Sequence, residues 1–249
     1  MWQELVKKID YPLALQLVTD EEVGGFDGTK YQVDKGVRAD FVIVGESTNL
    51  DIENKSKGIL WLKIFAKGKT AHGAYPWKGE NAIRKMNRFL DRLVKEYPDP
   101  KKEQWITTVN VSRIETPNKT FNKIPDYCEV WLDVRYIPEE SKTILKSLKK
   151  LVPNGFILEI VANEPALSTS EHNPYLTTLR KSIKEVIGKT PRILSANGSS
   201  DARHYARIGC PAIEFGPGGK GMGSDKEWIK ISDLEKYTRT LTHFLLSLS

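Results

Sequence analysis

Three adjacent carboxylates follow a short, largely apolar run near the start of the sequence. Residues 13–18 form the run, Asp20, Glu21 and Glu22 come next, and glycines stand at 24, 25 and 28. Adjacent carboxylates repel one another, so their cost in folding free energy is small only when solvent screens their charge or a cation neutralises it. Neighbouring residues also point in different directions, so one carboxylate can bind a metal ion while the next accepts a proton. A solvated acidic turn is the alternative interpretation.

Glu46 and His72 each lie in a loop that follows a predicted strand. Glu46 follows the apolar run 41–44 and Gly45, a place that suits a metal-binding carboxylate but equally the first turn of a helix. His72 lies in a loop of small residues, 68–76. Such a histidine is either solvated or held so that it donates to a developing oxyanion.

Arg135 is the candidate for binding a carboxylate. In the run 128–136, Cys128, Val130, Leu132 and Val134 alternate on one face, and Arg135 lies on the other face with Trp131 and Asp133. A guanidinium on a rigid strand suits bidentate capture of a carboxylate. An ion pair with Asp133 on the protein surface is the alternative.

A glycine-rich stretch near the C-terminus does not indicate nucleotide binding. Residues 197–203 read NGSSDAR, and a later strand ends in FGPGG at 215–219. No helix follows these glycines closely, and their spacing matches neither a P-loop nor a dinucleotide fingerprint.

The elements that position these residues form an α/β pattern interrupted by a second one. Residues 13–18 and 41–44 are predicted strands with acidic residues at their C-terminal ends, the edge where open α/β sheets bind ligands. From about residue 58, the spacing of apolar residues predicts strand 59–67, helix 83–97, strands 106–114 and 128–136, helix 144–152 and strand 156–161. This βαββαβ order is the split-βαβ, ferredoxin-like sandwich, which leaves one sheet face open for packing or dimerisation.

After about residue 162 the α/β pattern returns. Helices are predicted at 176–187 and 201–208, strands at 192–194 and 212–215, and a capping box at 232–235 opens the last helix. The sequence therefore predicts a discontinuous α/β catalytic domain, 1–57 and 162–249, with a βαββαβ domain, 58–161, inserted in it.

Composition and charge exclude several classes of protein. No apolar run approaches the roughly 20 residues of a membrane span. The net charge is +6, but the basic residues are scattered, and the densest group, Lys146, Lys149 and Lys150, is predicted on the outer side of a helix, which argues against nucleic-acid binding. An anionic small-molecule substrate is compatible with this charge. Cys128 and Cys210 form no CxxC pair and indicate buried thiols in a reducing compartment, so we expect a cytoplasmic protein.

From about Leu13 to the C-terminus, the order of these segments resembles the metallohydrolase family that contains succinyl-diaminopimelate desuccinylase, acetylornithine deacetylase, carboxypeptidase G and aminoacylase. The resemblance implies a zinc-exopeptidase-like catalytic domain with an inserted lid that dimerises. It makes Glu21 the general base and Glu22 a metal ligand. Glu46, in a Gly-Glu-Ser-Thr sequence where the family usually has proline in place of this serine, would be a ligand of the other metal.

The same resemblance assigns the remaining roles. His72 matches the lid histidine that reaches into the partner's active site, and Asn122 and Arg135 match the residues that hold the substrate's carboxylate. Ser199 and Ser200 fall in the family's substrate-side loop. The activity implied is hydrolysis of an N-acyl amino acid or of a C-terminal peptide bond, by a homodimer with two zinc ions, or cobalt or manganese, that acidify a bridging water.

Two departures from the family pattern bear on that activity. The family carries a metal-binding histidine and a bridging aspartate well before the position of Asp20, and this chain begins too close to Asp20 to include them. The family's last ligand is a histidine four residues before a glutamate, and here Gly223 precedes Glu227 by that spacing. Glu22 and Glu46 alone suit zinc poorly. The sequence therefore predicts weak zinc binding, with a non-catalytic dimerising module that binds a carboxylate-bearing, amino-acid-like ligand as the alternative.

Overall fold

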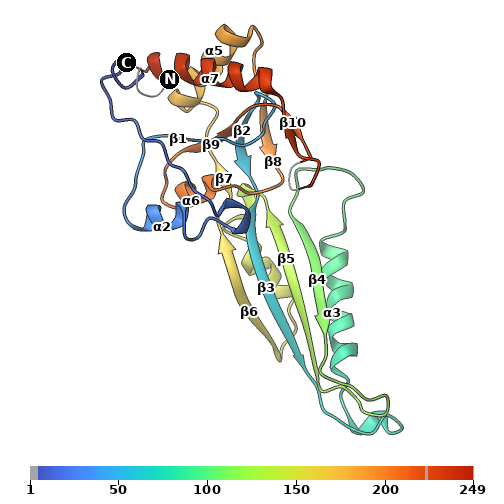
Figure 1. The fold of residues 1–249 in the computed structure, drawn as a ribbon. Coiled ribbons are helices and arrows are strands. Elements are labelled where there is room, and N and C mark those ends of the chain that lie inside the picture. The colour runs from blue at the N-terminus through green and yellow to red at the C-terminus, as the bar shows by residue number, and fades with distance from the viewer. Residues whose placement is uncertain (1–4, 222–223, 249) are drawn as a thin grey trace. The chain divides into compact units, whose positions relative to one another are not determined.

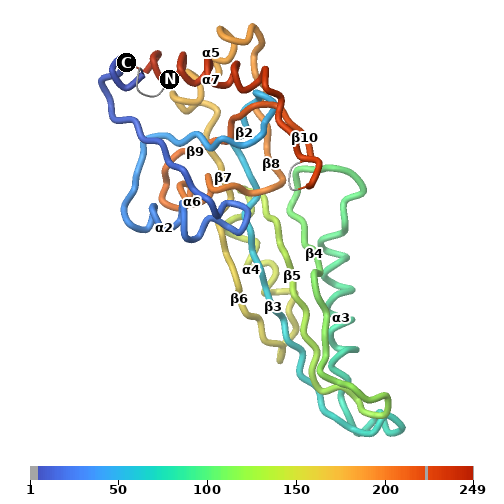
Figure 2. Tube along the Cα trace, viewed as in Figure 1, coloured from blue at the N-terminus to red at the C-terminus, as the bar shows by residue number. Residues whose placement is uncertain are grey.

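The computed structural model describes residues 5–221 and 224–248 and divides into two compact units. The first unit is Met1–Ser56 with Leu167–Ser249, and the second is Lys57–Ala166. The chain leaves the first unit at the end of β2 (Ile52–Ser56) and returns to it at β7 (Leu167–Ser168). Figure 2 follows this path from β2 directly into β3.

The second unit has the predicted βαββαβ order (Figure 1). Its elements are β3 (Gly58–Lys67), α3 (Ala82–Glu96), β4 (Thr108–Glu115), β5 (Tyr127–Tyr136), α4 (Ile144–Leu151) and β6 (Phe156–Glu164), with the short 3-10 helices η2 (Pro76–Lys78) and η3 (Pro138–Glu140). The strands lie in the order β4-β5-β3-β6, and every neighbouring pair is antiparallel. This topology confirms the predicted split-βαβ sandwich.

The strand β6 is longer than the sequence analysis predicted. The register between β3 and β6 shifts at Trp61 and Leu62, which pair with Ala162 and Ile160 and leave Val161 between them. Such a bulge breaks the alternation of side chains but does not end the strand. The strand continues to Glu164, and the second unit ends at Ala166 rather than at the predicted residue 161.

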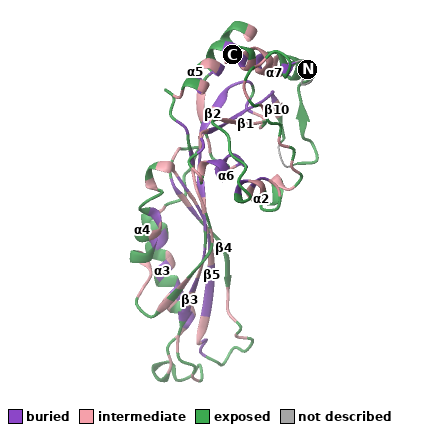
Figure 3. Cartoon of the chain, turned by 90° about the vertical axis from the view of Figure 1, so that its left-hand side faces the viewer, coloured by how far each residue is buried: buried purple, intermediate pink, exposed green. Residues whose placement is uncertain are grey.

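The core of the second unit lies between its sheet and its two helices. Alternate residues of β3 and β5 point toward the helices, and Figure 3 shows these buried positions along both strands. Met86 and Phe89 of α3 and Leu148 of α4 cover them and are at most 2% exposed. The side chain of Asn81 begins α3 by accepting a hydrogen bond from the backbone N–H of Arg84, which satisfies one of the free donors of the first turn.

The first unit contains a mixed five-stranded sheet. The strands β1 (Val42–Val44), β9 (Ala212–Phe215), β2 and β7 follow one another, and β8 (Ile193–Ala196) also pairs with β2. The pairs β1–β9 and β2–β8 are parallel, whereas β2 runs antiparallel to β9. A separate hairpin joins β10 (Gly219–Lys220) to β11 (Trp228–Ile229).

Two long helices cover one side of this sheet. They are α5 (Pro174–Ile187) and α7 (Ile231–Leu246), and their Leu179, Ile183 and Phe244 are buried with Ile213 and Phe215 of β9. The shorter elements η1 (Glu21–Val23), α2 (Thr29–Asp34) and α6 (Ala202–Ala206) complete the unit. Among the described residues, none of the helices is sufficiently long and apolar to span a bilayer.

Two predictions for the first unit are wrong. Residues 13–18 form no strand, and Leu15 and Leu17 are 62% and 81% exposed. A strand needs a partner for its backbone hydrogen bonds, and this run has none in the described parts of the chain. The predicted capping box is also absent, because α7 begins one residue before it, at Ile231, and the buried Asp233 pairs instead with Lys230 and Lys236.

Candidate functional site

The loop that carries Glu21 and Glu22 is closed by hydrogen bonds to Asp20. One carboxylate oxygen of Asp20 accepts hydrogen bonds from the backbone N–H groups of Asp27 (2.8 Å) and Gly28 (3.0 Å). Its backbone carbonyl accepts hydrogen bonds from Val23 and Gly25. The first acidic residue of the triplet therefore shapes the loop, and the other two remain available for chemistry.

The structure brings Glu21 and Glu22 within electrostatic reach of Glu46, which follows β1. Burial, followed by the charges of Glu46, Asp201 and Glu22, raises the pKa of Glu21 to about 7. Burial and then the charge of Glu22 also raise the pKa of Glu46. A carboxylate whose pKa is near neutrality can accept a proton from water and later release it.

Two side chains of α6 hold the carboxylate loop in place. The carbonyl oxygen of Gly24 accepts hydrogen bonds from a guanidinium N–H of Arg203 (2.6 Å) and from Nε2 of His204 (3.0 Å). Arg203 and His204 are 3% and 0% exposed. The second guanidinium nitrogen of Arg203 donates to the carbonyl of Ser200 (2.7 Å). The buried side chains of α6 thus fix the backbone immediately after Glu22.

Asp201, at the start of α6, also packs against the carboxylate loop. Its Oδ2 accepts a buried hydrogen bond of 2.5 Å from the hydroxyl of Thr29. Gly25 has a φ of +61°, and a Cβ atom there would lie 2.0 Å from Oδ1 of Asp201. Both the backbone conformation and the close approach require glycine at this position.

A buried glutamate that no sequence motif indicates lies on the sheet, beside a half-buried one. Glu214 of β9 is 4% exposed and stands opposite Glu53 of β2. Burial and the neighbouring Glu53 raise the pKa of Glu214 to about 8, against the opposing effect of the Ser200 hydroxyl, which donates a hydrogen bond of 2.6 Å. The only signal in the sequence is one glutamate inside the apolar strand Ala212–Phe215.

The two serines of the predicted substrate loop differ in their surroundings. The Ser200 hydroxyl is buried and donates its hydrogen bond to Glu214. The Ser199 hydroxyl is buried and has no hydrogen-bond partner among the described residues. Of the two, Ser199 is the one whose buried hydroxyl has no partner among the described residues.

His72 and Asn122 lie next to each other in the second unit. The backbone N–H of Gly73 donates a hydrogen bond of 2.7 Å to the carbonyl of Asn122, and His72 forms an isolated bridge with Lys123. Nδ1 of the exposed His72 accepts a hydrogen bond of 3.1 Å from the backbone N–H of Ala74. The neutral ring therefore carries its proton on Nε2, which is the donor that an oxyanion would need.

Arg135 lies far from Asn122 in the same unit. Asn122 precedes the first residue of β5, and Arg135 is close to its last, so roughly 26 Å of strand separates them at about 3.3 Å per residue. Nε and Nη2 of Arg135 donate to the two carboxylate oxygens of Asp133 at 2.9 and 3.2 Å. Within one unit, Asn122 and Arg135 do not converge on a common carboxylate, and the Asp133 ion pair is present.

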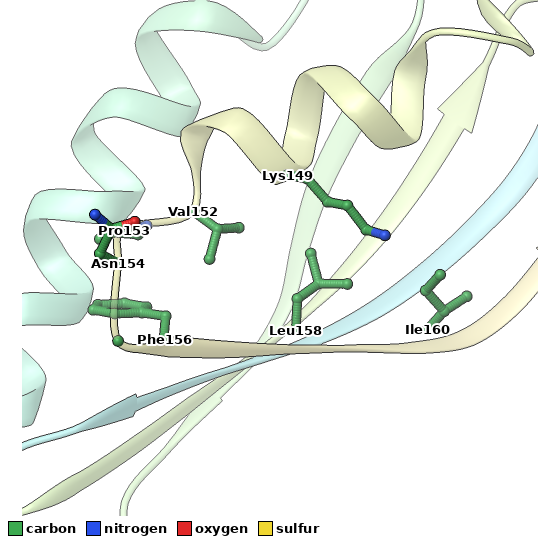
Figure 4. Close-up of a pocket in the computed structure, with 8 residues that line it drawn as sticks. Lys149, Val152, Pro153, Asn154, Phe156, Leu158 and Ile160 are labelled. Atoms are coloured by element: carbon green, nitrogen blue, oxygen red, sulfur yellow. The ribbon is translucent and has the colours of Figure 1, made fainter.

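A hollow of about 520 Å³ between α4 and β6 contains none of the predicted site residues. Figure 4 shows apolar side chains and the amine of Lys149 around it, and its lining is Lys149, Val152, Pro153, Asn154, Gly155, Phe156, Leu158 and Ile160. One cation and no carboxylate do not make a hydrolytic site.

The residues that the structure describes do not complete a metal centre. Within residues 5–221 and 224–248, no group of three or more histidine, cysteine, aspartate or glutamate side chains is arranged to hold a metal ion. Gly223, where the resemblance places a histidine ligand, lies outside the described residues. Glu22 and Glu46 are therefore too few for zinc, which takes four ligands in protein sites.

Comparisons with known proteins agree with this fold. Residues 54–156 match the family described as the peptidase dimerisation domain. The structure superposes on the aminopeptidase PepT from Bacillus cereus with a TM-score of 0.77 at 21% identity, covering 92% of this chain and 62% of the other. It superposes on an M20 family metallo-carboxypeptidase from Sulfolobus solfataricus with a TM-score of 0.64 at 18% identity, covering 91% and 68%. The family match therefore falls mainly on the inserted unit, Lys57–Ala166.

Sequence relatives extend the similarity over nearly the whole chain. It is 28% identical to a succinyl-diaminopimelate desuccinylase of Pelagibacter ubique and 28% identical to an acetylornithine deacetylase of Myxococcus xanthus, covering in both cases 96% of this chain and 66% of the relative. The chain spans just under two thirds of the length of these curated relatives. The similarity to these two relatives therefore extends over both units of the chain.

Proposed function

We propose that the protein is a metal-dependent hydrolase of N-acyl amino acids or of C-terminal peptide bonds. The observation that carries the proposal is the convergence of Glu21, Glu22 and Glu46, which come from two separate segments and share one electrostatic environment. Glu21 is the general base, because its pKa of about 7 allows it to take a proton from water and pass it to the leaving amine.

The substrate is proposed to be a small molecule with a free carboxylate. The loop that holds His72 beside Asn122 supports this part of the proposal, because it presents the Nε2–H of the histidine and an exposed amide together. Arg135 would bind such a carboxylate only if it released Asp133. The dimerisation domain supports a homodimer formed through the second unit.

Zinc is the metal proposed, with Glu22 and Glu46 on different ions, and cobalt or manganese as substitutes. When bound, such ions acidify a water molecule. Because the described residues do not complete the ligand set, we expect the chain as given to bind zinc weakly and to show no zinc-dependent hydrolysis of N-succinyl or N-acetyl amino acids. Calorimetric titration with zinc and an amine-release assay measure both properties.

A repaired protein provides the decisive test of this function. It carries Gly223→His and an added N-terminal segment with the family's histidine and aspartate. We expect it to bind two zinc ions and to hydrolyse N-acyl amino acids, and Glu21→Gln in this background to abolish hydrolysis with zinc retained. A repaired protein that folds but binds no zinc would contradict the roles of Glu22 and Glu46. If the unrepaired chain binds zinc tightly and stoichiometrically and hydrolyses these substrates, other residues must be zinc ligands.

The second candidate function is a dimeric module that binds a carboxylate-bearing, amino-acid-like ligand without hydrolysing it. The incomplete ligand set within the described residues favours this candidate. It predicts saturable binding of an N-acetyl amino acid to the repaired protein with no amine release.

A further inference from the structure

A second hollow lies in the second unit, beside the first turns of α3 and next to the loop that carries His72. Its volume is about 580 Å³, within the range of small-ligand pockets. The loop after η2, the start of α3 and the segment before β5 surround it. The residues that line it are Gly73, Pro76, Gly79, Glu80, Asn81, Arg84, Lys85, Arg88, Phe121, Lys123 and Ile124.

The walls of this hollow are held together by backbone hydrogen bonds. Lys69 and Glu80 exchange two of them, at 2.8 and 2.9 Å, and Ile124 donates to the carbonyl of Ala71 at 2.8 Å. Gly79 is packed so closely that a Cβ atom there would lie 2.8 Å from the carbonyl oxygen of Lys69. Ile124 is 7% exposed. The base of the hollow is therefore a fixed surface.

Positive charge dominates the lining. Arg84, Lys85, Arg88 and Lys123 face one carboxylate, that of Glu80. Glu80 pairs with Lys85 at 3.1 Å, and Lys123 is 3.4 Å from Asp126, which is outside the lining.

The two arginines lack such a partner. In the described part of the chain, no carboxylate forms an ion pair with Arg84 or Arg88. They stand four residues apart on one face of α3, where like charges repel. Nε of Arg88 donates to the carbonyl of Arg84 at 3.3 Å, which orients its guanidinium. Two adjacent guanidinium groups at a preformed hollow are suited to bidentate binding of anionic oxygens.

We propose that this hollow binds a small multivalent oxyanion, with Arg84 and Arg88 as its principal ligands and Lys123 as a third cation. Phosphate groups and clustered carboxylates share the required chemistry, which is several anionic oxygens within the span of two guanidinium groups. A monovalent anion satisfies only one of them and binds more weakly. None of the predicted catalytic or metal-binding side chains lines this site, but it adjoins the loop of His72, because Gly73 follows His72 and Lys123 forms a bridge with it.

The test uses the full chain with pyrophosphate and citrate as probes. Their binding is measured at constant ionic strength by isothermal calorimetry and by changes in backbone NMR chemical shifts. Acetate at matched ionic strength is the monovalent control. We expect saturable binding of at least one multivalent probe, with the largest shifts in residues 79–88 and 121–124. Binding of pyrophosphate alone identifies phosphate groups as the ligand chemistry, and binding of both probes extends it to clustered carboxylates.

Variants separate a specific site from general attraction to a basic protein. The double variant Arg84→Gln with Arg88→Gln should lose at least tenfold in affinity. The matched control Arg92→Gln, one turn further along α3 and outside the lining, should lose less than twofold. Thermal unfolding followed by circular dichroism checks that both variants fold. Equal losses in the two variants, unchanged affinity in the double variant, binding of acetate as strong as that of the multivalent probes, or no saturable binding of either probe would overturn the proposal.

Discussion

At the scale of single residues, burial rather than sequence position decides which carboxylates are chemically unusual. Glu21 and Glu214 have pKa values raised to about 7 and about 8, in both cases first by burial and then by neighbouring carboxylates. Glu159 of β6 has the same side-chain chemistry but is exposed. Burial therefore brings the pKa values of these two carboxyl groups close to neutral pH.

Glu214 should make the stability of the first unit depend on pH. Because its folded pKa of about 8 lies above the usual glutamate value of 4.5, its protonated form favours the folded state. This contribution to the free energy of unfolding is complete below about pH 4.5 and is lost as the pH rises through about 8. Urea unfolding from pH 5 to pH 9 should show a smaller loss of stability in Glu214→Gln than in the wild type. The exposed control Glu159→Gln should leave the wild-type slope unchanged, and an identical slope in Glu214→Gln would contradict the assignment.

The close approach of Gly25 to Asp201 gives a second prediction at this scale. Alanine there adopts an unfavourable positive φ and meets Oδ1 of Asp201, so Gly25→Ala should lower the free energy of unfolding by roughly 2–3 kcal/mol. Gly36 also has a positive φ, but nothing lies within 4 Å of the position that a Cβ atom would take there, so Gly36→Ala should cost only about 1 kcal/mol. Denaturant titrations of both variants measure the difference, and equal effects would show that the contact with Asp201 is unimportant.

At the scale of elements, α6 and α2 together hold the loop that carries the catalytic candidates. The buried hydrogen bond from Thr29 of α2 to Asp201 links the two helices, and Arg203 and His204 of α6 bind the carbonyl of Gly24. The position of the proposed general base therefore depends on contacts between segments that are distant in the sequence.

Thr29→Val tests this link. The substitution keeps the shape of the side chain but leaves a buried carboxylate oxygen of Asp201 without its donor, so we expect a loss of about 1–3 kcal/mol. Hydrogen exchange of the amides of Val23, Gly24 and Gly25 should accelerate, while exchange in β3 and β5 stays unchanged. Thr178→Val, which removes an exposed hydroxyl on α5, is the control. Unchanged exchange in the loop would show that the Thr29–Asp201 hydrogen bond does not help α6 to hold the loop.

At the scale of the whole molecule, the match of residues 54–156 to the peptidase dimerisation domain predicts association of two chains. The open face of its sheet carries Trp61, 41% exposed, and the edge strand β4 carries Ile114, 49% exposed. Sedimentation velocity at micromolar concentration should show a dimer. Trp61→Glu combined with Ile114→Glu should shift it toward monomer, whereas Ile231→Glu, at a residue of the other unit that is 81% exposed, should not. A wild-type monomer under these conditions would contradict the prediction.

The βαββαβ unit could be predicted from the sequence because each of its elements is encoded locally. Alternating apolar residues in β5 and the apolar stripe of α3 determine which face of each element is buried, and the order of elements then leaves few topologies. The same local reasoning failed for residues 13–18. An apolar run becomes a strand only when a neighbour supplies hydrogen bonds, and Leu15 and Leu17 have no such neighbour among the described residues.

The candidate site divides in the same way. The sequence by itself identified Glu21, Glu22 and Glu46 as candidates, because acidic residues after predicted strands are a local pattern. Only the tertiary structure decided that Ser200 donates a hydrogen bond to Glu214 and that Thr29 reaches Asp201 across 172 residues. Hydrogen-bond partners, and the desolvation that shifts a pKa, depend on which side chains from distant parts of the sequence are buried together. A local sequence pattern does not contain that information.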